Sequence, residues 1–263
     1  MNQELLAKSM AYAENNFLSN TARHLHVDKA FIKQHFNLKG KRVLDFGCGM
    51  GGMTLWLAQN GSCCEIMGLD IDGHHIAIAN QLKSKHKIEN VQFEKRDITT
   101  HPLPPQYEGS FDAIFLNDVV EHIPYPILEK IFAEFKRILT PKGRIFVSYP
   151  PWQSPYASHV VRVTKLPWCQ FLPEGILLNW IEKKNQVITG EHESDLVAAY
   201  KGLNRLTHEQ LMHIVRPQGF AIAQRLSHSL LRKLPILRGL NPNIFPFHFL
   251  ISKELLILEK QVL

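Results

Sequence analysis

Hydrophobic and polar positions along this chain follow two different periods, and the switches between them divide it into elements. Short apolar runs of the kind found in buried strands fall at residues 42–46, 65–70, 91–95, 111–116, 143–148, 219–226 and 249–259. Helical spacing of apolar residues predicts helices at 52–60, 73–86, 125–139 and 207–216. Because strand and helix alternate, we expect an α/β fold with a mostly parallel sheet and right-handed crossovers.

Three parts of the chain depart from this alternation. The last two predicted strands are long enough to pair as an antiparallel hairpin, which completes a seven-stranded sheet. Residues 1–36 have amphipathic spacing and should form one or two helices that cover the cleft. Residues 149–206 are rich in proline and aromatic residues, which is typical of a lid or substrate-binding insertion, with a dimer interface or core extension as the alternative. We expect one domain over 1–263, as a monomer or homodimer.

A glycine-rich loop at residues 43–54 carries most of the functional information. A short apolar strand leads into Gly47, Gly49 and Gly51, which can adopt positive φ angles and let a ligand approach the main chain. Asp45 stands two residues before the first glycine. Its carboxylate suits a cofactor with a cationic group, whereas a pyrophosphate at the following helix N-terminus would gain nothing from it.

This loop resembles motif I of the class I S-adenosylmethionine-dependent methyltransferases, in particular small-molecule enzymes of ubiquinone and polyketide pathways. The resemblance covers residues 38–148 and, less distinctly, the final hairpin. It implies a Rossmann-like sheet, S-adenosyl-L-methionine as methyl donor and S-adenosyl-L-homocysteine as product. The Asn/Asp-Pro-Pro-aromatic motif of amino-directed nucleic-acid methyltransferases is absent after the fourth strand, where residues 117–120 read Asn-Asp-Val-Val.

Residues at the carboxyl ends of the strands should hold the cofactor, because ligands of open α/β sheets bind there. Asp70 is placed to accept hydrogen bonds from the ribose hydroxyls, and Asp97 resembles the acid that receives the adenine amino group. Loop capping is the alternative role for these acids. The expected cofactor residues are Asp45, Gly47, Cys48, Gly49, Gly51, Asp70, Ile71, Asp97, Ile98 and Asn117.

Two histidines are the candidate catalytic bases. Methyl transfer to a hydroxyl requires removal of a proton, and histidine does this near neutral pH. His122 follows the fourth strand, which would hold it rigidly, and His159 lies in the insertion. We expect O-methylation of a small organic molecule. The alternatives are C- or N-methylation, a lipid-linked substrate, methylation of RNA or protein, and a non-catalytic cofactor-binding protein.

The same segment has a second interpretation as a metal site. Asp118, Glu121 and His122 resemble the acid-x-x-Glu-His of ubiquinone-biosynthesis O-methyltransferases, where these positions hold a divalent ion beside a catechol-like acceptor. Two carboxylates and an imidazole suit such an ion. The first acid here is Asp rather than Glu, which shortens its reach, and capping of the next helix is the alternative role for Asp118.

Aromatic residues in and before the insertion are the candidate acceptor wall. Tyr149, Trp152, Tyr156 and Trp168 would suit a medium-sized organic acceptor, unless they belong to the core. Residues 230–240 mix cations with apolar side chains and can be expected to contact a lipid-linked substrate or a membrane surface.

Composition narrows the classes of partner and location. The net charge is +6 and the pI is about 9.1, but Lys and Arg are scattered, so a nucleic-acid partner is not favoured. No apolar run is long enough to span a membrane and the amino terminus lacks a signal-peptide pattern, so we expect a soluble, cytoplasmic protein. The four cysteines show neither a disulfide framework nor zinc spacing, and Cys48 is expected to be a packing residue.

Overall fold

A computed structural model of the chain describes residues 3–21, 25–188, 196–233, 235–237 and 239–261. Within them the strands form one seven-stranded sheet in the order β3-β2-β1-β4-β5-β7-β6. β1 to β5 are parallel, and β7 runs antiparallel to both β5 and β6. The strands are β1 (Arg42–Phe46), β2 (Glu65–Asp70), β3 (Val91–Lys95), β4 (Phe111–Asn117), β5 (Leu139–Tyr149), β6 (Phe220–Ser229) and β7 (Ile251–Lys260). The predicted Rossmann-like sheet with a terminal antiparallel hairpin is confirmed.

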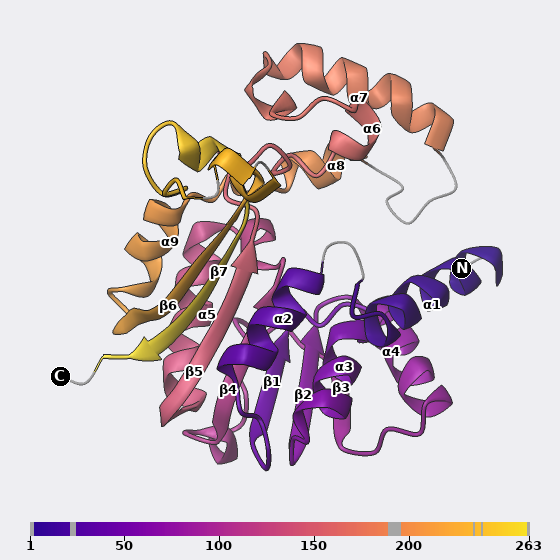
Figure 1. Ribbon diagram of the computed structural model, residues 1–263. Helices are drawn as coiled ribbons and strands as arrows, with labels where there is room; N and C mark the ends of the chain where they lie inside the picture. The colour runs from indigo at the N-terminus through magenta and orange to yellow at the C-terminus, as the bar shows by residue number, and fades with distance from the viewer. Residues whose placement is uncertain (1–2, 22–24, 189–195, 234, 238, 262–263) are drawn as a thin grey trace.

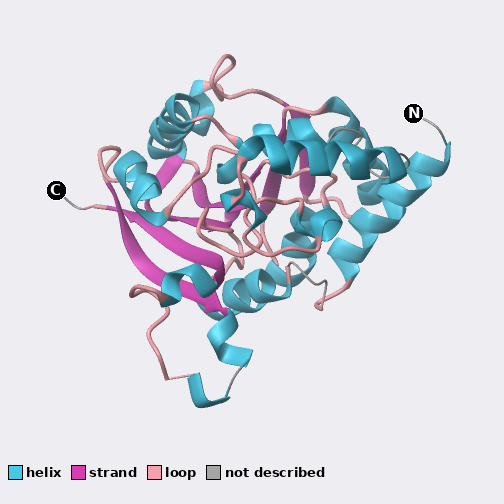
Figure 2. Cartoon of the chain, turned by 90° about the horizontal axis from the view of Figure 1, so that it is seen from above, coloured by secondary structure: helices cyan, strands magenta, loops and turns pink. Residues whose placement is uncertain are grey.

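Helices cover both faces of this sheet (Figures 1 and 2). One apolar layer joins the sheet to α1 (Gln3–Leu18), α2 (His26–His35), α3 (Gly52–Gly61) and α4 (Gly73–Lys85). The opposite layer joins it to α5 (Tyr125–Ile138) and α9 (His208–Val215). Because both faces are covered, the central strands are apolar on both sides, which is why they read as continuous hydrophobic runs.

The pattern of α5 shows how sequence produces one of these layers. Leu128, Ile131, Phe132 and Phe135 follow helical spacing and are all buried against the sheet. Burial of each such side chain contributes about 1.5–3 kcal/mol. The helix begins at Tyr125, and Pro126 in its first turn has a fixed φ that suits a helix start.

The insertion between β5 and β6 forms a small helical unit with its own core. It contains α6 (Val161–Thr164), α7 (Glu174–Ile188) and α8 (Leu196–Lys201), and residues 189–195 lie outside the described part of the chain. In Figure 1 this unit lies above the carboxyl ends of the parallel strands. Its buried apolar residues are Val160, Val163, Cys169, Leu177, Ile181, Leu196, Tyr200 and Leu203. The insertion is therefore placed where substrate-binding elements of such sheets lie.

One predicted boundary differs from the structure. The sequence predicts that Pro141 and Gly143 separate a helix from the fifth strand, yet β5 already begins at Leu139. Leu139 pairs with Phe111 of β4, and an irregularity in register precedes the pairing of Arg144 with Ala113. The proline thus falls in a β-bulge, a position where a strand tolerates it.

Candidate active site

The glycine loop after β1 is shaped by close contacts on two sides. Gly47, Gly49 and Gly51 all have positive φ angles, of 69°, 52° and 79°. A Cβ on Gly47 would lie 2.6 Å from a methyl carbon of Val119, and one on Gly51 would lie 2.7 Å from the ring of Phe93. A Cβ on Gly49 would meet no heavy atom within 4 Å. The first and third glycines therefore serve packing, while the second leaves open space beside the main chain.

Asp45 lies below this loop with almost no exposed surface. Its Oδ2 accepts a hydrogen bond of 2.6 Å from Thr54 Oγ1. Burial raises the pKa of Asp45 to about 7, partly offset by the Thr54 hydrogen bond and reinforced by the charge of Asp70. A cationic group placed nearby would favour the ionised form, as the sequence-based interpretation of Asp45 requires.

Asp70 ties the end of β2 to the glycine loop. Its carboxylate accepts hydrogen bonds of 2.8 Å from the main-chain N–H groups of Gly49 and Asp72. Nδ1 of His75 lies 3.6 Å from it. Burial raises the pKa of Asp70, but the contacts with His75, Asp72 and Gly49 outweigh burial and hold it below the ordinary value. Asp70 is thus a preorganised carboxylate at the edge of the cleft.

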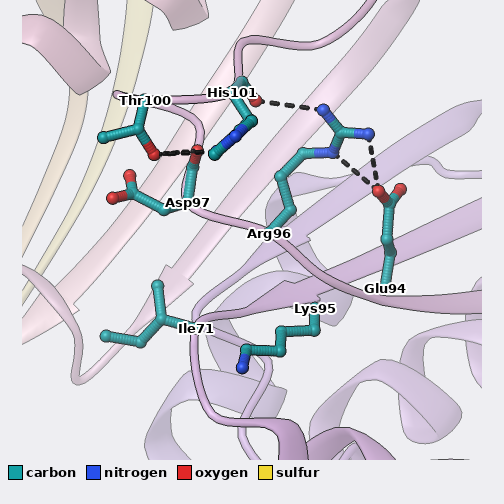
Figure 3. Close-up of a pocket in the computed structure, with 7 residues that line it drawn as sticks. All are labelled: Ile71, Glu94, Lys95, Arg96, Asp97, Thr100 and His101. Atoms are coloured by element: carbon teal, nitrogen blue, oxygen red, sulfur yellow. Dashed lines mark hydrogen bonds and ion pairs between the residues drawn. The ribbon is translucent and has the colours of Figure 1, made fainter.

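A pocket of about 480 Å³ opens beside the ends of β2 and β3. Two of the predicted cofactor residues, Ile71 and Asp97, line it together, and Ile71 is 71% exposed. The side chain of Arg96 contacts Glu94 and donates to the main-chain oxygen of His101 (Figure 3). The other lining residues, which the sequence did not single out, are Glu94, Lys95, Arg96, Thr100 and His101. These residues lie within a few positions of Asp97 in the sequence. The position of Asp97 at the end of a predicted strand was therefore the sequence signal that could have located them.

The remaining predicted cofactor residues differ in what they offer a ligand. Ile98 and Cys48 are buried, and burial raises the pKa of the Cys48 thiol well above its ordinary value, so packing is its role here. Asn117 ends β4 with both side-chain amide atoms buried and without a hydrogen-bond partner among the described residues. Buried polar atoms are nearly always paired, so Asn117 is available to a ligand.

Both predicted bases, His122 and His159, lie beside the carboxylate of Glu121. Nε2 of His159 is 3.7 Å and Nε2 of His122 is 4.0 Å from Glu121 Oε1, and the two ring centroids are 4.9 Å apart. Glu121 is buried, and neither of its oxygens accepts a hydrogen bond from the described residues. Burial, followed by repulsion from Asp118, raises the pKa of Glu121 well above its ordinary value.

Hydrogen bonds from Asn204 to main-chain carbonyls hold this cluster in place. The Asn204 side-chain amide donates to the carbonyl oxygens of Val120 and Ile123 at 2.7 Å each, and its main-chain N–H donates to that of Glu121 at 2.9 Å. Asn204 lies at the end of the insertion, 81 to 84 residues away in sequence. No local pattern marks it, so sequence reasoning did not find it.

Asp118 lies outside the group of potential ligand atoms that this cluster brings together, so its role as a metal ligand stays a prediction. Its Oδ2 contacts Lys253 Nζ at 2.7 Å, which satisfies the carboxylate without a metal. The potential ligand atoms that do lie together, all within 4.8 Å of one another, belong to Glu121, His122 and His159. The third potential ligand in this group is therefore His159 from the insertion, where the sequence predicted Asp118.

The predicted aromatic wall is only partly available. Tyr149 has no exposed surface, belongs to the apolar layer beneath α5 and α9, and donates from its hydroxyl to Glu254 of the neighbouring strand β7 at 2.9 Å, so it is a core residue. Trp152 packs against the core of the insertion. The indole N–H of Trp168 donates to a main-chain carbonyl of the β6–β7 connection, and Tyr156 is 43% exposed. Three of the four residues therefore remain candidates for acceptor binding.

Comparison with known proteins extends this picture. Residues 37–216 match the family model described as methyltransferase domain. A ubiquinone biosynthesis O-methyltransferase of Nitrosococcus oceani is 27% identical over 185 residues, which are 65% of this chain and 75% of that protein. A protein of the same name from Pseudomonas fluorescens is 34% identical over 119 residues, 45% of this chain and 48% of that protein, so the chain spans about half the length of this relative.

Among solved structures, that of geranyl diphosphate C-methyltransferase from Streptomyces coelicolor A3(2) with Mg²⁺, geranyl diphosphate and S-adenosyl-L-homocysteine resembles the fold with a TM-score of 0.56. The two share 15% sequence identity, and the match covers 89% of this chain and 77% of that one. The family model covers more than half of the chain and includes the glycine loop, the pocket and the Glu121 cluster. The chain therefore belongs to the methyltransferase family and is a class I S-adenosylmethionine-dependent methyltransferase.

Proposed function

We propose that this enzyme methylates a hydroxyl oxygen of a small organic molecule. The observation that carries the proposal is the cluster of His159 and His122 around the buried carboxylate of Glu121. The cluster adjoins the glycine loop, because Val119 of the same segment packs on Gly47. An imidazole backed by a carboxylate at this place is suited to remove a proton from the acceptor.

The residues of the cleft fit the cofactor. Open space beside Gly49, the unpartnered amide of Asn117 and the pocket lined by Ile71 and Asp97 provide a cradle and polar contacts for a nucleoside. When bound, S-adenosylmethionine supplies a methyl group already activated on a sulfonium. We assign Asp45 to the cationic part of this cofactor and Asp70 and Asp97 to its ribose and adenine. The protein has to align the acceptor and accept its proton.

The geometry favours His159 as the base, although the sequence favoured the more rigidly held His122. His159 is the nearer of the two to Glu121, and its side chain is 26% exposed against 44% for His122. Nε2 of His159 would receive the hydroxyl proton of the acceptor as its oxygen is methylated. Bound S-adenosylmethionine would supply the methyl group and leave as S-adenosylhomocysteine. The imidazolium that forms favours the ionised form of the buried Glu121 beside it, and that carboxylate in turn stabilises the imidazolium. His122 then orients the acceptor.

A divalent ion is the second candidate for the same cluster. The ligand atoms of Glu121, His122 and His159 lie close enough to share one ion. A metal there would lower the pKa of an acceptor hydroxyl bound to it and thus replace the base. Turnover measured after chelation, with and without added Mg²⁺ or Zn²⁺, decides between the two: full activity after chelation supports the histidine base.

Exposed apolar residues support an acceptor that is presented at a membrane surface. In the connection between β6 and β7, Ile236, Ile244 and Phe245 are 95%, 53% and 79% exposed, and Arg232 lies in the same connection. No helix among the described residues is long and apolar enough to cross a membrane. We therefore propose a lipid-linked acceptor as one form of the small-molecule substrate.

The cysteines support a cytoplasmic location. Cys48, Cys63, Cys64 and Cys169 are all free in the structure. Free thiols persist in reducing compartments such as the cytosol, whereas cysteines of secreted proteins often form disulfides.

The acceptor class is tested by incubating the enzyme with methyl-labelled S-adenosylmethionine and fractionated cell extract. We expect label in small or lipid-extractable molecules, in an ether linkage, and no transfer by an enzyme with both histidines replaced by alanine. Label in RNA or protein would overturn the proposed substrate class. Binding of S-adenosylmethionine without transfer to any fraction would favour the non-catalytic alternative.

A further inference from the structure

Lys253 joins three distant parts of the fold through one ammonium group. It lies on β7 with its side chain 12% exposed, and its Nζ is 2.8 Å from Asp28 Oδ2 and 2.7 Å from Asp118 Oδ2. Asp28 belongs to α2 and is fully buried, while Asp118 begins the segment that carries Glu121 and His122. A buried carboxylate such as Asp28 is costly unless paired, so this lysine stabilises Asp28 and ties Asp118 to it.

The contact at Asp118 fixes the start of the acceptor-side segment. Asp118 has a φ angle of +54°, a conformation that residues with a side chain hold where their surroundings impose it. Its main-chain N–H donates to Ser148 at 2.9 Å. The next residue, Val119, packs directly on Gly47 of the cofactor loop. A change in the placement of Asp118 would therefore move the segment that faces both halves of the cleft.

The contact at Asp28 reaches the cofactor loop by another route. The neighbouring residue Lys29, also buried, donates to main-chain carbonyls at the end of α1, those of Asn16 and Ser19. That end of α1 lies against the cofactor loop, since a Cβ on Gly52 would come within 2.6 Å of a main-chain oxygen of α1. Two consecutive charged residues of α2 are thus linked to α1 through Lys29 and, by way of Lys253, to the acceptor segment through Asp28.

From these contacts we propose that Lys253 is a positioning residue that couples the N-terminal cover of the cofactor to the acceptor-side segment 118–123. Cofactor binding between the glycine loop and α1 steadies α2, and Lys253 passes this restraint to Asp118. The segment with Glu121 and His122 is then ordered when the cofactor is in place. The inference rests on the proposed function, because it takes residues 118–123 to be the acceptor side.

Amide hydrogen exchange on the full chain, with S-adenosylhomocysteine as the probe, tests this coupling. In the wild type we expect the probe to slow exchange in both the glycine loop, 47–52, and the segment 118–123. In Lys253→Met the protection of 47–52 and the probe's affinity should change by less than about threefold, while the protection of 118–123 falls by about tenfold. Comparing bound with free protein within each variant cancels a general loss of stability.

Two variants control this experiment. Lys260→Met removes a part-buried lysine from the same strand, where its ammonium binds only the main-chain oxygen of Leu139 among the contacts described, and should leave both protections unchanged. Lys253→Arg keeps the charge and should restore protection of 118–123 at least in part. If Lys253→Met does not fold, Asp118→Asn removes one arm of the bridge and should loosen the same segment.

The possible results separate the inference from the function on which it rests. Equal protection of 118–123 in wild type and Lys253→Met, or an equal loss in both segments, would overturn the coupling while leaving the enzyme's function standing. A wild-type protein in which the probe protects only 47–52 would overturn it as well. Failure of the wild type to bind the probe at all would reject the cofactor assignment and the coupling together.

Discussion

At the scale of single residues, burial of Asp45 shifts its pKa into the physiological range. Burial raises its pKa from 3.8 to about 7. Between these values the folded protein keeps a proton that the unfolded chain has lost, so Asp45 contributes stability that is complete below about pH 4 and is lost as the pH rises through 7. A cationic ligand reverses this preference, because it favours the carboxylate.

We therefore expect cofactor binding to release a proton from Asp45. At pH 6.5 binding of S-adenosylmethionine to the wild type should release about 0.7 proton, since a group with a pKa near 7 is mostly protonated there. Calorimetry in two buffers of different ionisation enthalpy measures this number. Asp45→Asn, which cannot ionise, is the matched control and should release none. Equal proton release by both proteins would assign the linkage to another group.

The two histidines allow a second prediction at this scale. His159→Ala should lower turnover by about a hundredfold or more, and His122→Ala by about tenfold, because only the first loses the proton acceptor. Binding of S-adenosylhomocysteine should stay within about threefold in both. His213→Ala, an exposed histidine of α9, provides the control. The opposite order of the two effects would make His122 the base, and near-normal turnover in both would exclude a histidine base.

At the scale of elements, local patterns predicted most of what the structure contains. Apolar periodicity placed the seven strands and the main helices, because each face of the sheet buries a full layer. Contacts between distant residues are what the local patterns could not predict. Tyr149 donates to Glu254 of the neighbouring strand β7, more than 100 residues later, and Asp118 is paired by Lys253, 135 residues away. The hydrogen bonds from Asn204 to Val120 and Ile123 also join residues that are far apart in the sequence, so no spacing within one element predicts them.

The glycine loop offers a prediction with an internal control. Gly47 and Gly40 share a φ angle of +69°, but a Cβ on Gly47 would strike Val119 whereas one on Gly40 meets nothing within 4 Å. Both alanine variants carry the same backbone strain of about 1 kcal/mol. Gly47→Ala should in addition weaken S-adenosylhomocysteine binding by about tenfold or more, and Gly40→Ala should bind within about twofold of wild type. Calorimetric titration measures both.

If the two variants bound the cofactor equally well, contact between the glycine loop and the acceptor segment would not matter for the cleft. The thermal midpoints serve as the check on strain: both should fall by the amount due to the shared φ angle, and Gly47→Ala should fall somewhat further because Val119 must be displaced. A much larger fall for Gly47→Ala would indicate that the clash is relieved by unfolding of the loop rather than by displacement of Val119.

At the scale of the whole molecule, the proposed cofactor and acceptor sites depend on different parts of one sheet. The glycine loop and the pocket depend on the β1–β3 half of the sheet, and the Glu121 cluster depends on β4 and the insertion. The segment 118–123 is shared by both, since it touches Gly47, Lys253 and Asn204. The β6–β7 connection adds a third feature, a set of exposed apolar side chains on the sheet edge opposite the pocket.

These exposed side chains lead to the prediction that the protein binds anionic lipid surfaces. Side chains as exposed as Ile236 and Phe245 gain free energy by entering the apolar boundary of a bilayer, and nearby cations such as Arg232 add attraction to anionic headgroups. We expect cosedimentation with vesicles that contain phosphatidylglycerol and much weaker binding to pure phosphatidylcholine. Replacing both apolar residues with serine should weaken vesicle binding by about tenfold or more without changing cofactor affinity.

The matched control is Leu18→Ser, at an apolar residue of α1 that is 55% exposed, and this variant should bind vesicles as the wild type does. Binding that is absent from both kinds of vesicle, or weakened equally by the control, would remove the membrane surface from the proposed function and leave a freely diffusing acceptor in its place.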